Sequence, residues 1–253
     1  SVMSSHPLAR RSHIRGPLGE ISFFTIISMP ENFEPTVEQP KPYWQRMRDL
    51  EAQLFPEFKE EDYCIDSPET NNFYFAPSVH FRKDLITETD VENFRKNPKR
   101  QMLSVGSGPA YLERLLVHLG INKDNIVLAD KEPRDLPTDF KTKIFDMFGE
   151  WPEFEDDQKF DLIIFPENPS INVHYDYGEE RIQAFTSLFA KALQHLKPGG
   201  EIKITGNPND TEITEKVEQE LRRSGYNVTV QNFTDEGKES LIVVKNETSP
   251  NTA

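Results

Sequence analysis

The stretch from Met102 to Glu113 constrains the fold more than any other part of the chain. A short apolar run leads into Gly106 and Gly108, and leucines at helical spacing follow: Leu112, Leu115, Leu116 and Leu119. This order predicts a strand, a tight turn and a helix. Glycines let the backbone pass close to a ligand, and the free amides at the start of a helix point toward it. We therefore expect a ligand site at this turn.

From residue 101 onward the pattern alternates between strands and helices. We expect strands at 102–105, 126–130, 143–146, 160–165, 201–205, 227–233 and 241–245, and helices at 109–119, at 179–196 and after Asp210. Such alternation predicts parallel βαβ units, whereas the short loop between the last two strands requires antiparallel pairing. The predicted fold is α/β, a doubly wound, mostly parallel seven-stranded sheet with one antiparallel strand in a C-terminal hairpin. This domain is expected over 101–246, followed by a tail at 247–253.

The first hundred residues have a different composition. Residues 1–40 combine early arginines with a Pro- and Glu-rich passage that buries little apolar surface, so we expect a flexible segment. Within 41–100, apolar residues recur every three or four positions from Tyr43 onward, which predicts a helix, and Thr89 or Asp90 can cap a second one. We therefore expect an N-terminal helical extension or lid over 41–100.

Composition and charge exclude several classes of protein. The net charge of -14 disfavours binding to a nucleic-acid backbone, and the basic cluster at 95–100 is interpreted as a solvated helix end. Cys64 is the only cysteine, so no intrachain disulfide is possible, and the six histidines show no metal-ligand spacing. No apolar run reaches the roughly 18–20 residues of a membrane span, and no signal peptide stands out, so we expect a cytoplasmic protein.

Two acids and one aromatic residue indicate which ligand the turn binds. Asp130 ends the next predicted strand, 24 residues after Gly106, where a carboxylate can accept hydrogen bonds from both hydroxyls of a ribose. Asp146 ends the strand after that, where it can meet an adenine edge. The dinucleotide pattern G-x-G-x-x-G/A needs a small residue where this chain has Tyr111, whereas Ala110 takes the third small position of a Gly-x-Gly-x-Ala turn. This disfavours a nucleotide-dependent oxidoreductase.

Together these residues resemble a class I S-adenosylmethionine-dependent methyltransferase over 102–245. The resemblance is carried by Val105–Ala110, Asp130, Asp146-Met147, Leu196-Lys-Pro-Gly-Gly200 and the hairpin at 227–245. It implies a Rossmann-like fold, S-adenosyl-L-methionine as the cofactor, and methyl transfer to a small-molecule or protein acceptor. The cofactor contacts that we expect from it are Gly106, Ser107, Gly108, Asp130, Lys131, Asp146, Met147 and Pro166.

The chain departs from the family pattern at two positions. The family usually has an acid just before the first glycine, where it helps to place the cofactor's amino group, but here Ser104 and Val105 are not acidic. Ala110 also replaces the usual third glycine. These departures keep open an alternative in which the fold serves a catalytically inactive binding or scaffold protein. The Val-Gly-Ser-Gly-Pro turn is also similar to that of nicotianamine synthases, so aminocarboxypropyl transfer is a further alternative.

The loop after the fourth strand is the expected acceptor side. Pro166-Glu-Asn-Pro-Ser170 opens at the carboxyl edge of the sheet, where ligands bind in this architecture. Glu167 is the candidate catalytic base, with an ordinary polar loop residue as the alternative, and polar and aromatic residues at 172–177 could line an acceptor pocket. Methyl transfer depends mainly on in-line positioning, with a base only when the acceptor is protonated.

Overall fold

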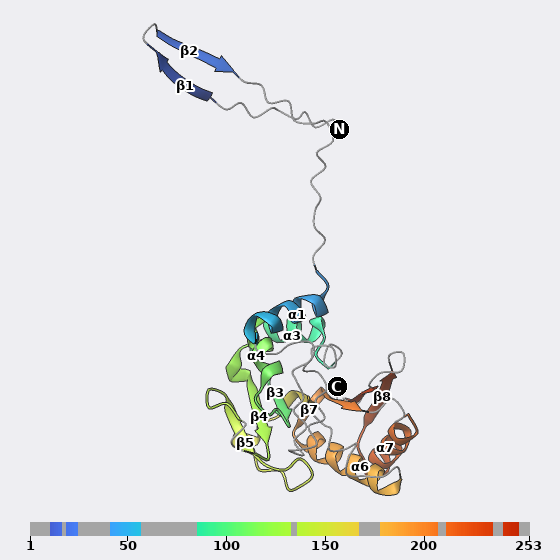
Figure 1. Cartoon of the computed structure of the whole chain (residues 1–253). Coiled ribbons are helices and arrows are strands. Elements are labelled where there is room, and N and C mark those ends of the chain that lie inside the picture. The colour runs from blue at the N-terminus through green and yellow to red at the C-terminus, as the bar shows by residue number, and fades with distance from the viewer. Residues whose placement is uncertain are drawn as a thin grey trace, which may run out of the picture. The chain divides into compact units, whose positions relative to one another are not determined.

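The computed structural model describes residues 11–16, 19–24, 41–56, 85–132, 136–166, 178–206, 211–234 and 240–247. The chain divides into two compact units, Ser1–Lys41 and Pro42–Ala253. In the first unit, β1 (Arg11–Gly16) and β2 (Gly19–Phe24) form an antiparallel hairpin (Figure 1). No strand was predicted within 1–40, because its overall composition is typical of a flexible segment.

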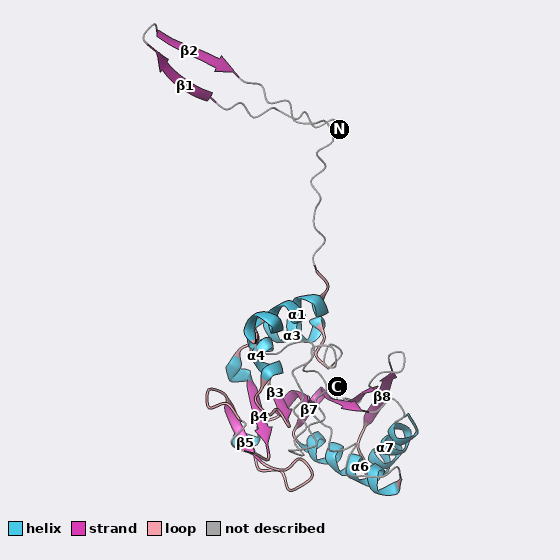
Figure 2. Ribbon diagram, in the orientation of Figure 1, coloured by secondary structure: helices cyan, strands magenta, loops and turns pink. Residues whose placement is uncertain are grey.

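The second unit is built on a seven-stranded sheet with the strand order β5-β4-β3-β6-β7-β9-β8 (Figure 2). The strands are β3 (Met102–Val105), β4 (Ile126–Asp130), β5 (Lys141–Ile144), β6 (Phe160–Phe165), β7 (Leu196–Gly206), β8 (Val228–Thr234) and β9 (Ser240–Asn246). β9 pairs antiparallel with both β7 and β8, and the other neighbouring pairs are parallel. The predicted mostly parallel sheet with one reversed strand in a C-terminal hairpin is confirmed.

Helices cover both faces of this sheet. One face carries α1 (Tyr43–Leu54), α3 (Glu88–Lys96) and α4 (Tyr111–His118), and the other carries α6 (Glu179–Gln194) and α7 (Thr211–Arg223) (Figure 1). Because side chains alternate along a strand, Leu103 packs in the core under α6 and α7, whereas Met102 packs in the core under α1, α3 and α4. The described helices of 41–100 thus complete one layer of the domain, and a lid role for them stays a prediction.

The start of α3 differs from the prediction. Its N-cap is Thr87, and not Thr89 or Asp90. The Thr87 hydroxyl accepts a hydrogen bond from the Asp90 amide (3.2 Å), and the Asp90 carboxylate accepts one from the Thr87 amide (2.8 Å). This reciprocal capping box satisfies two backbone donors.

The glycine turn is also longer than predicted. α4 begins at Tyr111, because Ala110 has a left-handed backbone (φ 59°) that cannot belong to a right-handed helix. Pro109 therefore lies in the turn and not in the first helical turn. Likewise β5 ends at Ile144, two residues before the predicted end, which leaves Asp146 in the following loop.

The Lys-Pro-Gly-Gly segment lies within β7, although the strand was predicted to begin only at residue 201. β7 begins at Leu196, which pairs with Phe160, and the next pair of the same ladder is Leu162 with Glu201. The residues between Leu196 and Glu201 therefore form an irregularity in β7. Gly200 fits tightly there, because a Cβ atom at this position would lie 2.9 Å from the Leu196 side chain.

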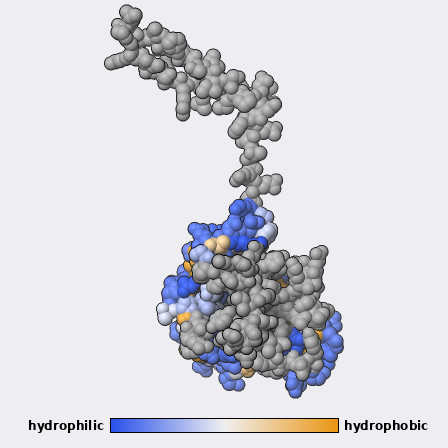
Figure 3. Space-filling view, viewed as in Figure 1, coloured by the Kyte–Doolittle hydropathy of each residue, from blue (hydrophilic) through white to orange (hydrophobic). Residues whose placement is uncertain are grey.

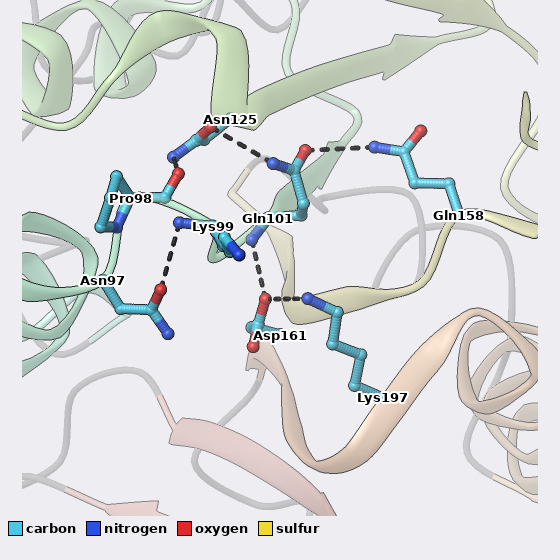
Figure 4. Close-up of polar contacts among 8 residues, drawn as sticks. All are labelled: Asn97, Pro98, Lys99, Gln101, Asn125, Gln158, Asp161 and Lys197. Atoms are coloured by element: carbon cyan, nitrogen blue, oxygen red, sulfur yellow. Dashed lines mark hydrogen bonds and ion pairs between the residues drawn. The ribbon is translucent and has the colours of Figure 1, made fainter. Parts of the chain in front are cut away.

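A polar network holds the amino ends of the parallel strands together (Figure 4). The backbone amide of Gln101 donates to Asp161 Oδ2 (2.8 Å), and Lys197 Nζ lies 2.7 Å from the same oxygen. Gln101 Nε2 donates to Asn125 Oδ1 (3.2 Å), and Asn125 Nδ2 donates to the Pro98 carbonyl (2.8 Å). These contacts connect the starts of β3, β4, β6 and β7 at the edge opposite the glycine turn.

The described surface is mainly hydrophilic on the face shown in Figure 3. Trp44 and Ile144 are the exposed large apolar side chains of the described residues. No helix in the described ranges is long and apolar enough to cross a membrane.

Candidate functional site

The glycine turn between β3 and α4 has left-handed residues at alternate positions. Gly106, Gly108 and Ala110 have φ values of 74°, 50° and 59°. Glycine adopts this conformation without the clash that a Cβ atom causes, which accounts for the first two positions. Ala110 bears the strain at the third, so the turn keeps its shape without the third glycine.

Strand β4 holds the turn in place. The amides of Gly106 and Ser107 both donate to the Ala129 carbonyl, at 2.7 and 3.2 Å. The Gly108 amide donates to Asp130 Oδ2 (3.0 Å), and Asp130 Oδ1 accepts from the Glu132 amide (3.0 Å). A carboxylate has about four acceptor positions, so Asp130 can hold the turn and still accept from a ligand.

Asp146 lies beside Asp130, in the loop after β5. The Phe145 amide donates to the Asp130 carbonyl (3.1 Å), which fixes the loop against the tip of β4. The exposed Asp146 carboxylate accepts from the Phe148 amide (2.9 Å) and so bends its own loop. Met147 packs against the core, and its carbonyl accepts from Trp151 Nε1 (2.9 Å).

The His195 ring supports this loop from the end of α6. It stacks on Trp151 with a centroid distance of 5.7 Å and an interplanar angle of 9°. Burial and the nearby charge of Lys159 lower the pKa of His195 below its usual 6.5, so the neutral ring is favoured in this apolar contact. Lys191 Nζ donates to the carbonyls of Phe148 and Gly149, both at 2.9 Å.

The predicted cofactor residues therefore lie along one edge of the sheet. They follow the carboxyl ends of four neighbouring strands in the order β5, β4, β3, β6: Asp146 and Met147, then Asp130 and the exposed Lys131, then Gly106 to Gly108, then the buried Pro166. Their individual roles stay predictions. Glu167 and the residues at 172–177 lie outside the described residues.

Comparisons with solved structures found several methyltransferases. SibL, an S-adenosylmethionine-dependent methyltransferase in its apo form, is 15% identical over 65% of this chain, with a TM-score of 0.43, and this chain spans only 54% of SibL. The glycopeptide N-methyltransferase MtfA complexed with sinefungin is 15% identical (71% of this chain, 98% of MtfA, TM-score 0.45). A Listeria monocytogenes protein assigned to the class I S-adenosylmethionine-dependent methyltransferases is 11% identical. The match covers 83% of this chain and 70% of that protein, with a TM-score of 0.49. No family model and no curated protein sequence matches the chain.

At these identities and TM-scores, the fold assignment rests on the chain's own topology. The seven strands, the reversed β9 and the helices on both faces are those that the sequence analysis predicts. The chain has the predicted Rossmann-like α/β fold, a mostly parallel seven-stranded sheet with one antiparallel strand. In open α/β sheets ligands bind outside the carboxyl ends of the strands, and the glycine turn lies at this edge.

Next to the glycine turn lies a buried acid that was not among the residues predicted from the sequence. Ser104 Oγ donates a hydrogen bond to the carboxylate of Glu113, and both residues are buried, at 0% and 1% exposure. Glu113 comes from the first turn of α4, so an acid reaches Ser104 from the helix although none precedes Gly106 in the strand. One feature of the sequence could have indicated this acid: Glu113 lies among the leucines of the helix that faces the sheet.

The turn also contains a buried hydroxyl that a ligand could satisfy. Ser107 is 3% exposed, and its Oγ has no hydrogen-bond partner among the described residues. An unpaired buried hydroxyl costs free energy, which a polar ligand at the turn would recover. The residues at the turn therefore fit a polar ligand, and the described part of the chain contains no His, Cys, Asp and Glu cluster suited to a metal ion.

Proposed function

We propose that this protein is an S-adenosylmethionine-dependent methyltransferase acting on a small-molecule or protein acceptor. The observation that carries the proposal is the hydrogen bond from the Gly108 amide to Asp130. A phosphate-binding turn offers its amides to the anion, whereas this turn gives the Gly108 amide to a carboxylate, and a second carboxylate, Glu113, is buried behind it. A carboxylate in the place of a phosphate disfavours a pyrophosphate and suits a cofactor without phosphates.

The site residues would position the cofactor and do little chemistry themselves. S-adenosylmethionine supplies a methyl group on a sulfonium, which is already a good leaving group. Gly106 to Gly108 would hold its amino-acid end, Asp130 would accept hydrogen bonds from the ribose hydroxyls, and Asp146 with Met147 would lie near the adenine. Lys131 and Pro166 are proposed as flanking contacts. For an acceptor that must lose a proton, Glu167 is the proposed base.

Calorimetric titration tests the cofactor assignment. The protein is titrated with S-adenosylmethionine, S-adenosylhomocysteine and NAD, alongside Asp130→Ala and the control Asp161→Asn at the opposite edge of the sheet. We expect both sulfur compounds to bind and NAD not to bind. Asp130→Ala should weaken binding about tenfold or more, since hydrogen bonds to a charged group are lost, and the control should leave it unchanged.

Absence of binding by either sulfur compound would contradict the enzyme assignment. Binding that survives Asp130→Ala unchanged would contradict the placement of the ribose. A radiolabelled methyl donor, incubated with separate small-molecule and protein pools, then distinguishes the two acceptor classes. If the cofactor binds but no pool gains label, the scaffold alternative replaces the enzyme.

A further inference from the structure

We propose that Lys191 is a positioning residue, which acts through the loop at 145–151 and thereby sets how selectively this protein binds its base. The proposal rests on the proposed function, in which Asp146 and Met147 of this loop lie near the adenine. Lys191 lies on α6, and its ammonium group contacts the loop. It would therefore act on the ligand through Asp146 and make no contact with the ligand itself.

The loop turns at Asp146 and uses this residue to hold its own shape. The Gly149 amide donates to the Asp146 carbonyl (3.0 Å), and the Phe148 amide donates to Asp146 Oδ1 (2.9 Å). The second carboxylate oxygen, Oδ2, has no hydrogen-bond partner within the described part of the chain. The turn thus fixes the Asp146 carboxylate by one oxygen and leaves the other available to accept a hydrogen bond from a ligand.

The Lys191 ammonium closes this turn from α6. It donates to the carbonyls of Phe148 and Gly149, both at 2.9 Å, and the side chain is partly buried there. Among the described residues it forms no ion pair, although the chain has 43 acidic residues and 29 Lys and Arg residues. A partly buried ammonium needs hydrogen-bond partners, and the two loop carbonyls are those partners. The charge of Lys191 is thus used on the loop.

A second contact from α6 holds the next part of the same loop. His195 follows Lys191 by four residues, about one helical turn, and its ring stacks on Trp151 at the C-cap of α6. Trp151 Nε1 in turn donates to the Met147 carbonyl (2.9 Å). The three successive carbonyls at 147–149 are therefore all held by α6 or by a side chain that stacks on it. This arrangement orders the peptide groups that directly follow Asp146.

A carboxylate held in one orientation distinguishes bases better than a mobile one. Adenine presents an exocyclic amino donor beside a ring-nitrogen acceptor, whereas hypoxanthine presents a carbonyl acceptor beside a ring N–H donor. A fixed Asp146 carboxylate can accept from the amino group and is repelled by the carbonyl. Without Lys191, two of the three loop carbonyls lose their donor, and the loop must be ordered when the ligand binds, which costs binding free energy.

Two ligands that differ only in the base test the proposal by calorimetry, S-adenosylhomocysteine and S-inosylhomocysteine. Lys191→Met should weaken the binding of S-adenosylhomocysteine about threefold to tenfold, the range for one hydrogen bond, and that of S-inosylhomocysteine less than about twofold. Lys191→Arg keeps the donors and should restore the ratio of the two affinities. The control Lys141→Met removes an ammonium that also donates to a backbone carbonyl at 2.9 Å, that of Asp124, and should leave the ratio unchanged.

Hydrogen exchange of the ligand-free protein tests the same step without a ligand. The backbone amides at 147–151 should exchange about tenfold faster or more in Lys191→Met and at the wild-type rate in Lys141→Met. Unchanged exchange, or an unchanged affinity ratio in Lys191→Met, overturns the proposal, as does an equal fall of both affinities, which a merely structural role predicts. If Lys191→Met does not fold, Lys191→Gln keeps one kind of donor without the charge and should give an intermediate ratio. A wild-type protein that binds neither compound contradicts the proposed function itself, which is distinguishable from these outcomes.

Discussion

Ala110 is the residue of the site with a strained backbone, because it has a side chain and adopts a left-handed conformation. A left-handed conformation costs a residue with a Cβ atom roughly 1–2 kcal/mol, and Ala110 adopts it with φ 59°. The Ala110 methyl is also fully buried and packs in the core beneath α4, and a buried methyl contributes about 0.8 kcal/mol. The two effects oppose each other, so packing offsets part of the strain.

The first prediction concerns substitutions at this position. Ala110→Gly should change the free energy of unfolding by less than about 1 kcal/mol, because relief of strain is offset by the lost methyl and a more flexible unfolded chain. Ala110→Val should destabilise by about 2–4 kcal/mol, because a branched side chain suits neither the left-handed backbone nor the full core. Urea unfolding measures both variants. Equal stability of the two would contradict the assigned backbone conformation.

At the scale of elements, α3 is attached to the sheet through a buried ion pair. Lys203 on β7 pairs with Asp90, which also belongs to the capping box of α3. Burial raises the pKa of the Asp90 carboxyl, but the charge of Lys203 and the hydrogen bonds from Lys203 and Thr87 outweigh it and hold the pKa below its usual 3.8. The stabilisation is therefore present above pH 3.8 and is lost as the pH falls through the folded-state pKa.

A pair of variants tests this attachment. Asp90→Asn should destabilise by about 2–4 kcal/mol, because it leaves the buried Lys203 ammonium with only the more distant Glu201 carboxylate, at 3.7 Å. The double variant Asp90→Asn with Lys203→Met should recover a large part of that loss, since no charge remains buried. Urea unfolding at pH 7 measures the coupling between the two sites. Additive losses in the double variant would show that the pair contributes nothing to holding α3.

How well the sequence predicted each element depended on how local its determinants are. β4 and β6 are apolar runs flanked by polar residues, and both have the predicted bounds. The start of α3 was misplaced, because Thr87, Thr89 and Asp90 are all capping residue types and only the three-dimensional hydrogen bonds choose among them. The β7 irregularity depends on pairing with β6, which the Lys-Pro-Gly-Gly segment alone does not encode.

At the scale of the whole molecule, some parts of the candidate site could be predicted from the sequence pattern and others could not. The glycine turn, Asp130 and Asp146 lie together because strand ends in a parallel sheet meet at one edge, a consequence of topology that the sequence pattern contains. The contact between Ser104 and Glu113 could not be predicted in this way. It depends on how α4 packs across β3, and the sequence showed only that Ser104 is not acidic.

The two edges of the sheet should therefore be separable by experiment. At the amino edge, the Asp161 carboxylate accepts a hydrogen bond from the backbone amide of Gln101 and forms an ion pair with Lys197 (Figure 4). Asp161→Ala should destabilise by about 1–3 kcal/mol, because a partly buried backbone amide loses its acceptor and Lys197 its partner. The affinity of the folded protein for S-adenosylhomocysteine should stay within about twofold of wild type, because the substitution lies at the far end of β6 from the glycine turn.

Asp130→Ala at the carboxyl edge provides the matched comparison. It also removes an acceptor from a backbone amide, that of Gly108, so a stability loss of similar size is expected. Unlike Asp161→Ala, it should also weaken the binding of S-adenosylhomocysteine. Urea unfolding and calorimetry on the same two proteins separate stability from binding. If Asp161→Ala weakened binding as much as Asp130→Ala at equal folded fractions, the ligand site would extend through the sheet, and its placement at the carboxyl edge would be wrong.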